Sequence, residues 1–170
     1  GVAPEGFKNS SLLTVATADT SLDSTDFGGL RYVVEGYDAA QLDFGKSSAK
    51  QITLSFYVRS NITGTYSVAF RNSAASRSYA ADYTIDSVDT WERKTITIAA
   101  DTSGTWLTDT GTGIDLRFCL WGGGYTTSPN AWGNGNFVGT TNTNTSWIAT
   151  VGNTFQITGV QLEVGDTATP

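Results

Sequence analysis

The sequence predicts an all-β fold, an antiparallel β-sandwich of jelly-roll type. Eight short stretches alternate apolar and polar residues, as expected of strands that bury one face. Polar, turn-rich segments separate these stretches, and no apolar stripe with helical spacing exceeds two turns. The low charge of 15% and the 19 glycines are also typical of many short strands joined by polar turns.

The expected strands are distributed along the whole chain. In order, they span residues 12–16, 30–35, 51–60, 65–72, 78–85, 91–99, 116–121 and 155–164. Residues 38–42 have the composition of a single helical turn. Residues 60–64 are expected to form a five-residue hairpin connection between the third and fourth strands, with Gly64 at a positive φ angle.

We expect one domain over residues 1–170, a fragment of a longer polypeptide, with residues 1–29 its weakest match and a tail at 165–170. Residues 122–152 differ from the rest because they are rich in Gly, Asn and Thr and lack periodicity. Their aromatic residues are Tyr125, Trp132, Phe137 and Trp147. So long a loop in a compact domain is usually functional or ordered by a partner. The alternative is that its aromatic residues hold the loop against the sandwich.

The charge and the histidine and cysteine counts exclude several classes of function. Lys and Arg number 10 against 16 Asp and Glu, which gives a net charge of −6 without a basic cluster, so nucleic acid is not an expected partner. No stretch has the length of a membrane span, and we expect no membrane insertion. Histidine is absent and Cys119 is the only cysteine, so an internal disulfide is excluded and a zinc site would need carboxylates almost alone.

An enzymatic function would depend on carboxylates. Without a histidine to activate it, Cys119 is expected to be a small residue on a strand. A glycosidase needs two carboxylates about 5–10 Å apart, but no spacing pairs the candidates specifically. The candidates are Glu35, Asp38, Asp43, Asp82, Asp86 and Glu163. We therefore expect that the protein is not an enzyme.

One face of the expected sheet carries aromatic and basic side chains. Alternation directs nine apolar side chains into the core: Leu54, Phe56, Val58, Tyr66, Val68, Phe70, Leu116, Phe118 and Leu120. The opposite face then gathers Tyr57, Arg59, Arg71, Arg117 and Trp121. This combination suits sugars, because aromatic rings cover the apolar face of a pyranose while guanidinium groups donate to its hydroxyl or acidic groups.

Three interpretations of this face are open. It is a glycan-binding groove, a contact with a neighbouring subunit, or a solvated surface on which the arginines pair with carboxylates. Trp121, Tyr125 and Trp132 form a second candidate binding site, because a loop that leaves the sheet edge could present them at one rim of the sandwich. The alternative is that Trp132 and Trp147 cover an open end of the core.

Four segments resemble a known domain. They are "RYVVEGYDAAQLDFG" (31–45), "AKQITLSFYVRSNITGTYSVAFRNSAASRSYAADYTI" (49–85), "TWERKTITIAADTSGTW" (90–106) and "FQITGVQLEVGDTATP" (155–170). In this order they resemble a recurrent domain of bacteriophage tail fibres and related virion appendages, which is distantly similar to jelly-roll carbohydrate-binding modules. The resemblance covers residues 30–170, and its most specific parts are residues 54–66 and 157–163.

The resemblance implies a non-catalytic virion domain, exposed to the extracellular medium, that attaches to host-surface glycans. It also implies a homotrimer in contact with other virion proteins. The runner-up is a purely structural fibre or capsid-decoration module whose surface packs against other subunits. No cofactor is expected, and the jelly-roll likeness suggests at most a structural calcium ion held by carboxylate and backbone oxygens. The resemblance carries no motif of defined binding residues.

Overall fold

The computed structural model describes residues 2–144 and 146–170, and within them the chain is mostly β-strand. The strands are β1 (Ser11–Thr14), β2 (Phe27–Glu35), β3 (Ile52–Ser60), β4 (Gly64–Arg71), β5 (Arg77–Ile85), β6 (Glu92–Ile98), β7 (Thr112–Gly122), β8 (Thr126–Thr127), β9 (Ala131–Asn134), β10 (Gly139–Thr140) and β11 (Thr154–Val164). The helical elements are α1 (Gly36–Ala39), η1 (Ala40–Leu42) and η2 (Ser146–Ala149). No helix in the described ranges has the length and apolar character needed to cross a membrane.

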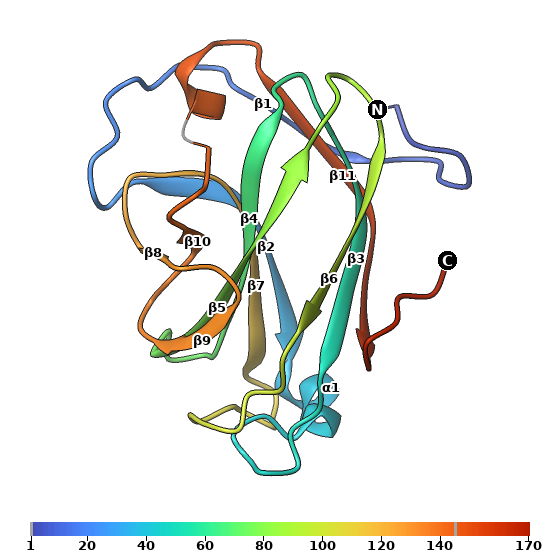
Figure 1. Ribbon diagram of the computed structural model, residues 1–170, viewed down its shortest axis with the longest axis vertical. Coiled ribbons are helices and arrows are strands. Elements are labelled where there is room, and N and C mark those ends of the chain that lie inside the picture. The colour runs from blue at the N-terminus through green and yellow to red at the C-terminus, as the bar shows by residue number, and fades with distance from the viewer. Residues whose placement is uncertain (1, 145) are drawn as a thin grey trace.

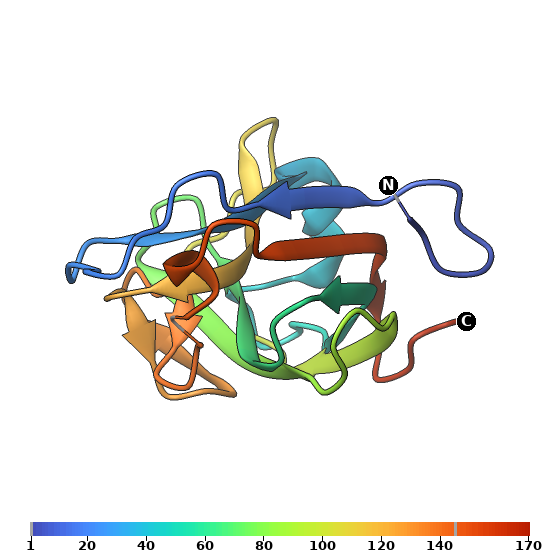
Figure 2. The ribbon, with the colours of Figure 1, turned by 90° about the horizontal axis from the view of Figure 1, so that it is seen from above.

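Two antiparallel sheets pack face to face. The four-stranded sheet has the order β1-β11-β3-β6, and the five-stranded sheet has the order β2-β7-β4-β5-β9. β8 and β10 form a separate, short parallel pair. Figure 1 shows the long strands running along the molecule with α1 at one end, and the view in Figure 2 shows β1 beside β11.

The strands predicted from alternation are present in the structure. Each of the eight expected stretches overlaps one strand, from β1 to β7 and then β11. β2 and β7 begin earlier than expected, at Phe27 and Thr112. The expected helical turn at 38–42 corresponds to α1 and η1. Residues 1–29 contribute to both sheets, because β1 lies in the four-stranded sheet and β2 begins the edge of the other.

The core lies between the two sheets. All nine apolar side chains predicted to be buried are at most 4% exposed. Across the core, the ring of Phe56 packs edge-to-face on Tyr83 at 5.0 Å and on Phe118 at 5.1 Å. Burying one ring of this size stabilises the fold by about 1.5–3 kcal/mol. These contacts therefore fix which face of each strand points inward.

The predicted hairpin between the third and fourth strands is wrong. β3 pairs with β11 and β6, whereas β4 pairs with β5 and β7, so residues 61–63 cross from one sheet to the other. Gly64 does have the expected positive φ, at 135°. Alternation alone does not distinguish the two arrangements, because strands that pair and strands that face each other across a core both need one apolar side.

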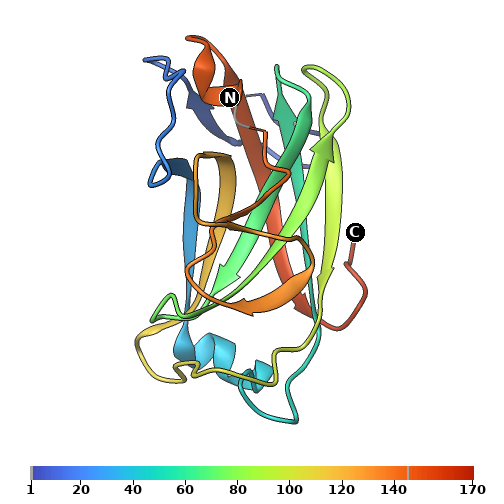
Figure 3. The ribbon, with the colours of Figure 1, turned by 60° about the vertical axis from the view of Figure 1, so that its left-hand side comes forward.

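Residues 131–143 lie over the five-stranded sheet. β9 pairs with β5 and extends the sheet, and Figure 3 shows the following segment passing across the strands. The hydroxyl of Thr143 lies 2.7 Å from that of Ser67, and Thr140 is only 1% exposed. The chain itself therefore covers the middle of this outer face and leaves open the part that lies over β2 and β7.

Candidate functional site

The five residues predicted to share one face belong to two different sheets, and one of them, Trp121, packs against the core. Tyr57 and Arg59 belong to β3 and therefore to the four-stranded sheet, whereas Arg71, Arg117 and Trp121 belong to β4 and β7 of the five-stranded sheet. The prediction of a common face is wrong for the same reason as the predicted hairpin. The outward sides of two sheets that pack face to face point in opposite directions.

On the four-stranded sheet, both predicted residues have partners within the chain. The ring of Tyr57 contacts that of Phe7, with centroids 5.4 Å apart. Arg59 donates to the Gln156 side chain at 2.7 Å and forms an ion pair with Asp89 at 2.9 Å. One arginine thus faces one carboxylate here, which matches the interpretation of a solvated surface with paired charges.

Trp121 has a structural role. Its indole stacks on that of Trp147, with ring centroids 5.5 Å apart and planes at 15°. It also lies over Gly28, where an added methyl group would be 2.0 Å from Trp121 Cζ2. A register shift between β2 and β7 lies at this point, between Gly28 and Gly29. Trp121 therefore packs against the core instead of being displayed with Arg117.

Trp132 also has a structural role, in a separate aromatic group. Its ring packs on Phe44 at 5.6 Å, on Trp106 at 5.5 Å and on Tyr79 at 5.2 Å. Its Nε1 donates to the carbonyl oxygen of Ala99 at 2.7 Å. The prediction that Trp121, Tyr125 and Trp132 share one rim is therefore wrong. The alternative, in which Trp132 and Trp147 pack against the core, describes both residues.

Three arginines surround one carboxylate on the open part of the five-stranded sheet. We call Arg31 (β2), Arg71 (β4), Asp115 and Arg117 (both β7) the arginine cluster. Arg31 lies directly opposite Arg117 in the strand register, and Arg71 lies directly opposite Asp115. Because directly opposite residues of an antiparallel pair share a face, the central position of β7 brings these four side chains together.

Asp115 is the centre of the arginine cluster. Its Oδ1 accepts from Arg31 at 2.9 Å, and its Oδ2 accepts from Arg71 at 2.5 Å and from Arg117 at 3.2 Å. Burial, which leaves Asp115 only 4% exposed, would raise the pKa of its carboxyl, but hydrogen bonds from the three guanidinium groups outweigh burial and lower that pKa. The carboxylate is therefore ionised at neutral pH and neutralises one of three positive charges.

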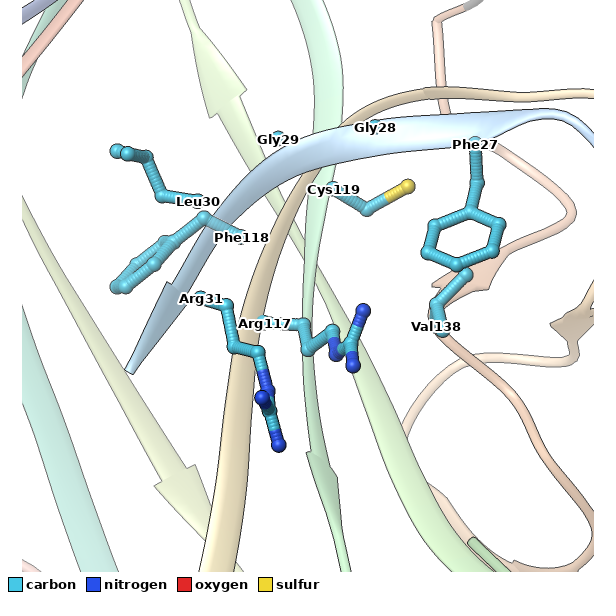
Figure 4. A pocket seen from close by; sticks show the side chains of 9 residues that line it. All are labelled: Phe27, Gly28, Gly29, Leu30, Arg31, Arg117, Phe118, Cys119 and Val138. Atoms are coloured by element: carbon cyan, nitrogen blue, oxygen red, sulfur yellow. The ribbon is translucent and has the colours of Figure 1, made fainter. Parts of the chain in front are cut away.

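A hollow of about 150 Å³ adjoins the arginine cluster. Its lining comprises Phe27, Gly28, Gly29, Leu30, Arg31, Arg117, Phe118, Cys119 and Val138. Figure 4 shows Phe27 beside Val138, with the side chains of Arg31 and Arg117 extending from neighbouring strands. A methyl group at Gly29 would lie 1.8 Å from the carbonyl oxygen of Phe118, so the close approach of β2 to β7 requires glycine at this position.

The ring of Phe27 lines the hollow, and the ring of Tyr125 packs against it to complete an aromatic rim. Phe27 and Tyr125 meet edge-to-face with centroids 5.6 Å apart, and they are 37% and 39% exposed. The Cζ atom of Arg117 lies 5.7 Å from the centre of the Phe27 ring, a cation–π arrangement. The carbonyl oxygen of Tyr125 accepts from the amide of Val138 at 2.8 Å, which holds the rim against the covering segment.

Of the seven predicted residues, the structure brings Arg71 and Arg117 together at Asp115, and it places Tyr125 against Phe27, which lines the hollow. It adds Phe27 and Arg31 from β2 and Asp115 from β7, which were not among the predicted residues. Arg31 lay in an expected strand, next to the inward-facing Leu30, so alternation already placed it on an outer face. Alternation does not reveal that β2 pairs with β7, and this pairing is what brings Arg31 beside Arg117.

The arginine cluster and the hollow offer positive charge and exposed aromatic rings. The Asp115 carboxylate is already hydrogen-bonded, and the Cys119 thiol is not ionised. Burial raises the pKa of Cys119 to about 11, so its thiol is protonated at neutral pH. Asp115 accepts hydrogen bonds from three arginines. Within residues 2–144 and 146–170, no group of three or more Cys, Asp or Glu side chains is placed to hold a metal ion. The cluster is thus suited to holding an anion.

Comparisons with known proteins identify no relative. No family model matches the chain, and neither the curated proteins nor the solved structures contain a match. The arginine cluster, the hollow and the fold are therefore the features that bear on its function.

Proposed function

We propose that this chain is a non-catalytic domain of a virion appendage, comparable to a tail fibre, that attaches to host cells by binding surface glycans. One observation carries the proposal. At a hollow on an otherwise acidic protein, the exposed Phe27 ring adjoins Arg31 and Arg117, and the exposed Tyr125 ring packs against Phe27. A pyranose has an apolar face that packs on such rings and hydroxyl groups that accept from guanidinium donors.

The strand order supports a jelly-roll fold for this domain. The first and last strands, β1 and β11, are neighbours, in the order β1-β11-β3-β6. The second sheet contains β2-β7-β4-β5 in that order, with β9 added at its edge. Eight strands in two sheets of this kind are typical of jelly rolls, which occur in viral and lectin domains. The likeness of residues 30–170 to phage appendage domains agrees with that assignment.

Attachment by such a domain would use many weak contacts. A single shallow sugar site binds weakly, and a homotrimer on an appendage exposed to the extracellular medium presents several copies at once. Simultaneous engagement raises the overall affinity by roughly 10²–10⁴ without any new contact. We propose no bond chemistry for the site, because its one carboxylate, Asp115, already accepts from three guanidinium groups.

A glycan array tests the proposal. The chain is expected to bind a subset of bacterial surface glycans, and the double variant Arg117→Ala, Tyr125→Ala is expected to lose that binding while it still unfolds in one cooperative thermal transition. The matched control is Tyr57→Ala, Arg59→Ala on the four-stranded sheet, which should retain binding. An array on which the wild-type chain binds no glycan would overturn the proposal.

A second candidate function is a packing module, and a specific groove favours it. An apolar groove of about 480 Å³ lies between β2 and β11, lined in part by Tyr32, Val160 and Leu162. Tyr32 is 65% exposed and Val160 is 44% exposed. In the described part of the chain, β2 pairs only with β7, so its other edge is open to a strand of a second copy.

Mass measurement in solution separates the two functions. If the groove joins copies of this chain, Tyr32→Ser with Val160→Asp will convert an oligomer into monomers and leave the melting curve cooperative. Glycan binding by the hollow would survive in that monomer with reduced avidity. A wild-type chain that is monomeric at high concentration would contradict the packing function.

A further inference from the structure

The arginine cluster carries more positive charge than the protein itself neutralises. Three guanidinium groups share the single Asp115 carboxylate. Arg31 and Arg117 are directly opposite each other on β2 and β7, and like charges in such positions destabilise a sheet. Because the whole protein has a net charge of −6, this excess is a local feature and does not reflect a generally basic surface.

Several donors of the cluster have no acceptor in the protein. Nε of Arg71 is buried without a hydrogen-bond partner among the described residues. Arg31 donates to Asp115 only through Nε, and its side chain is 52% exposed. Arg117 donates to Asp115 through Nε and Nη2. The outward nitrogen atoms of Arg31 and Arg117 are therefore placed to donate to an incoming anion.

We infer that the ligand of this site is an acidic glycan, in which a carboxylate of one sugar accepts from Arg31 and Arg117. The inference rests on the proposed function and specifies the class of glycan. A carboxylate is planar and accepts two parallel hydrogen bonds from guanidinium donors, which makes such pairs shorter and stronger than neutral ones. It would also supply the second negative charge that the cluster lacks.

The aromatic rim selects a sugar as the carrier of that carboxylate. Phe27 lies under the guanidinium group of Arg117, and the exposed ring of Tyr125 meets its edge. We expect a pyranose that places its carboxylate between the two arginines to pack its apolar face against the exposed parts of these two rings. The hollow of about 150 Å³ is small, so it accommodates one charged sugar of a chain.

The acidic surroundings disfavour denser polyanions. Nucleic acid presents one charge per about 1.7 Å of duplex and binds where many phosphates are neutralised together. The whole chain has 16 acidic against 10 basic residues, so 15 acidic and 7 basic residues remain outside the cluster, and one of those seven, Arg59, is already paired with Asp89. A polysaccharide with one widely spaced carboxylate per repeat avoids this repulsion.

Two binding measurements test the inference. The first is an array that carries neutral, uronic-acid and sulfated glycans. The second is a titration of the chain with polygalacturonate oligomers and with the same oligomers after carboxyl reduction. We expect binding to carboxylate-bearing glycans, loss of binding on carboxyl reduction, and weakening as salt is added. Arg31→Gln and Arg117→Gln should each weaken binding about tenfold, because each removes charge-assisted hydrogen bonds. Arg59→Gln, on the other sheet, is the matched control and should bind as the wild type does.

The outcomes separate this inference from the proposed function. Binding confined to neutral glycans, or unchanged by carboxyl reduction, would overturn the acidic ligand and leave glycan attachment intact. Binding confined to sulfated glycans would assign the site to a sulfate instead and overturn the carboxylate. No binding to any glycan would overturn both. Equal weakening by Arg59→Gln and Arg117→Gln would place the ligand elsewhere. Arg117→Lys keeps the positive charge but removes the planar guanidinium group, so it should weaken binding if the carboxylate accepts two hydrogen bonds. Wild-type binding by Arg117→Lys would contradict that geometry.

Discussion

The outer surfaces of the two sheets hold arginines in opposite ways. On the four-stranded sheet, Arg59 has its own carboxylate, Asp89, which is half exposed. On the five-stranded sheet, Arg31, Arg71 and Arg117 share one buried carboxylate, Asp115. An arginine on one surface thus forms an ion pair with its own carboxylate, whereas three arginines on the other surface have one carboxylate between them. The local ratio of charges, more than the presence of arginine, distinguishes a candidate binding site.

The largest expected effect comes from removing the shared carboxylate. Asp115→Ala should lower the free energy of unfolding by about 3–5 kcal/mol, because it leaves the buried Arg71 without a counter-charge. Asp89→Asn should cost less than about 1 kcal/mol, because its pair with Arg59 is partly solvated and Asn tolerates the φ of 55° at this position. Urea unfolding of both variants measures the contrast, and equal losses would show that the two surfaces do not differ as described.

A smaller loss of stability is expected when a side chain at position 28 is pushed against the indole of Trp121. Gly28→Ala places a methyl group 2.0 Å from Trp121 Cζ2 and should displace the stack on Trp147, which costs about 1–3 kcal/mol. The matched control is Gly122→Ala, where the nearest atom would be 3.5 Å away. Thermal unfolding with tryptophan fluorescence measures both. A Gly28→Ala protein as stable as the control would place the indole elsewhere.

Lowering the pH should destabilise the fold in part by protonating Asp115 on the five-stranded sheet. The lowered pKa of Asp115 means that its ionised form stabilises the folded state fully above its ordinary value of 3.8. That stabilisation is lost as the pH falls through the lowered pKa. The free energy of unfolding should therefore decrease more steeply between about pH 5 and pH 2 in the wild type than in Asp115→Asn. Parallel curves from denaturant unfolding at each pH would contradict this assignment.

The smallest expected effect is that of chelation. Calcium binds to carboxylate and other oxygen ligands. The one carboxylate of the arginine cluster, Asp115, already accepts from three guanidinium groups. We expect EDTA to leave the melting temperature and the glycan binding of the chain unchanged. A lower melting temperature in EDTA that calcium restores would establish a metal site outside the arginine cluster.

The sequence predicted the strands well because alternation is a local property. Leu54, Phe56 and Val58 turn inward in β3, as do Val68 and Phe70 in β4, and each strand could be read from its own residues. The sheet to which a strand belongs depends on its partners, which are distant in the sequence. Arg59 and Arg71 were therefore assigned to one face, although residues 61–63 carry the chain from one sheet to the other.

The candidate site could be predicted only in part, for the same reason. Arg117 and Tyr125 were selected by residue type and position, and both adjoin the hollow. Arg31 and Phe27 reach it only because β2 pairs with β7. Trp121 was misplaced because the register shift near Gly28 and its stack on Trp147 are not encoded in period-two alternation.

The crossing at residues 61–63 has a consequence for how such a domain can diversify. It puts Arg59 and Arg71 on surfaces separated by two layers of backbone and a core about 10 Å thick, comparable to the screening length in physiological salt. A substitution on one surface therefore acts on the other only at long range, through no shared hydrogen bond or ion pair. Each surface can change residue by residue while the ion pairs of the other, Arg59 with Asp89 or Arg71 with Asp115, are kept.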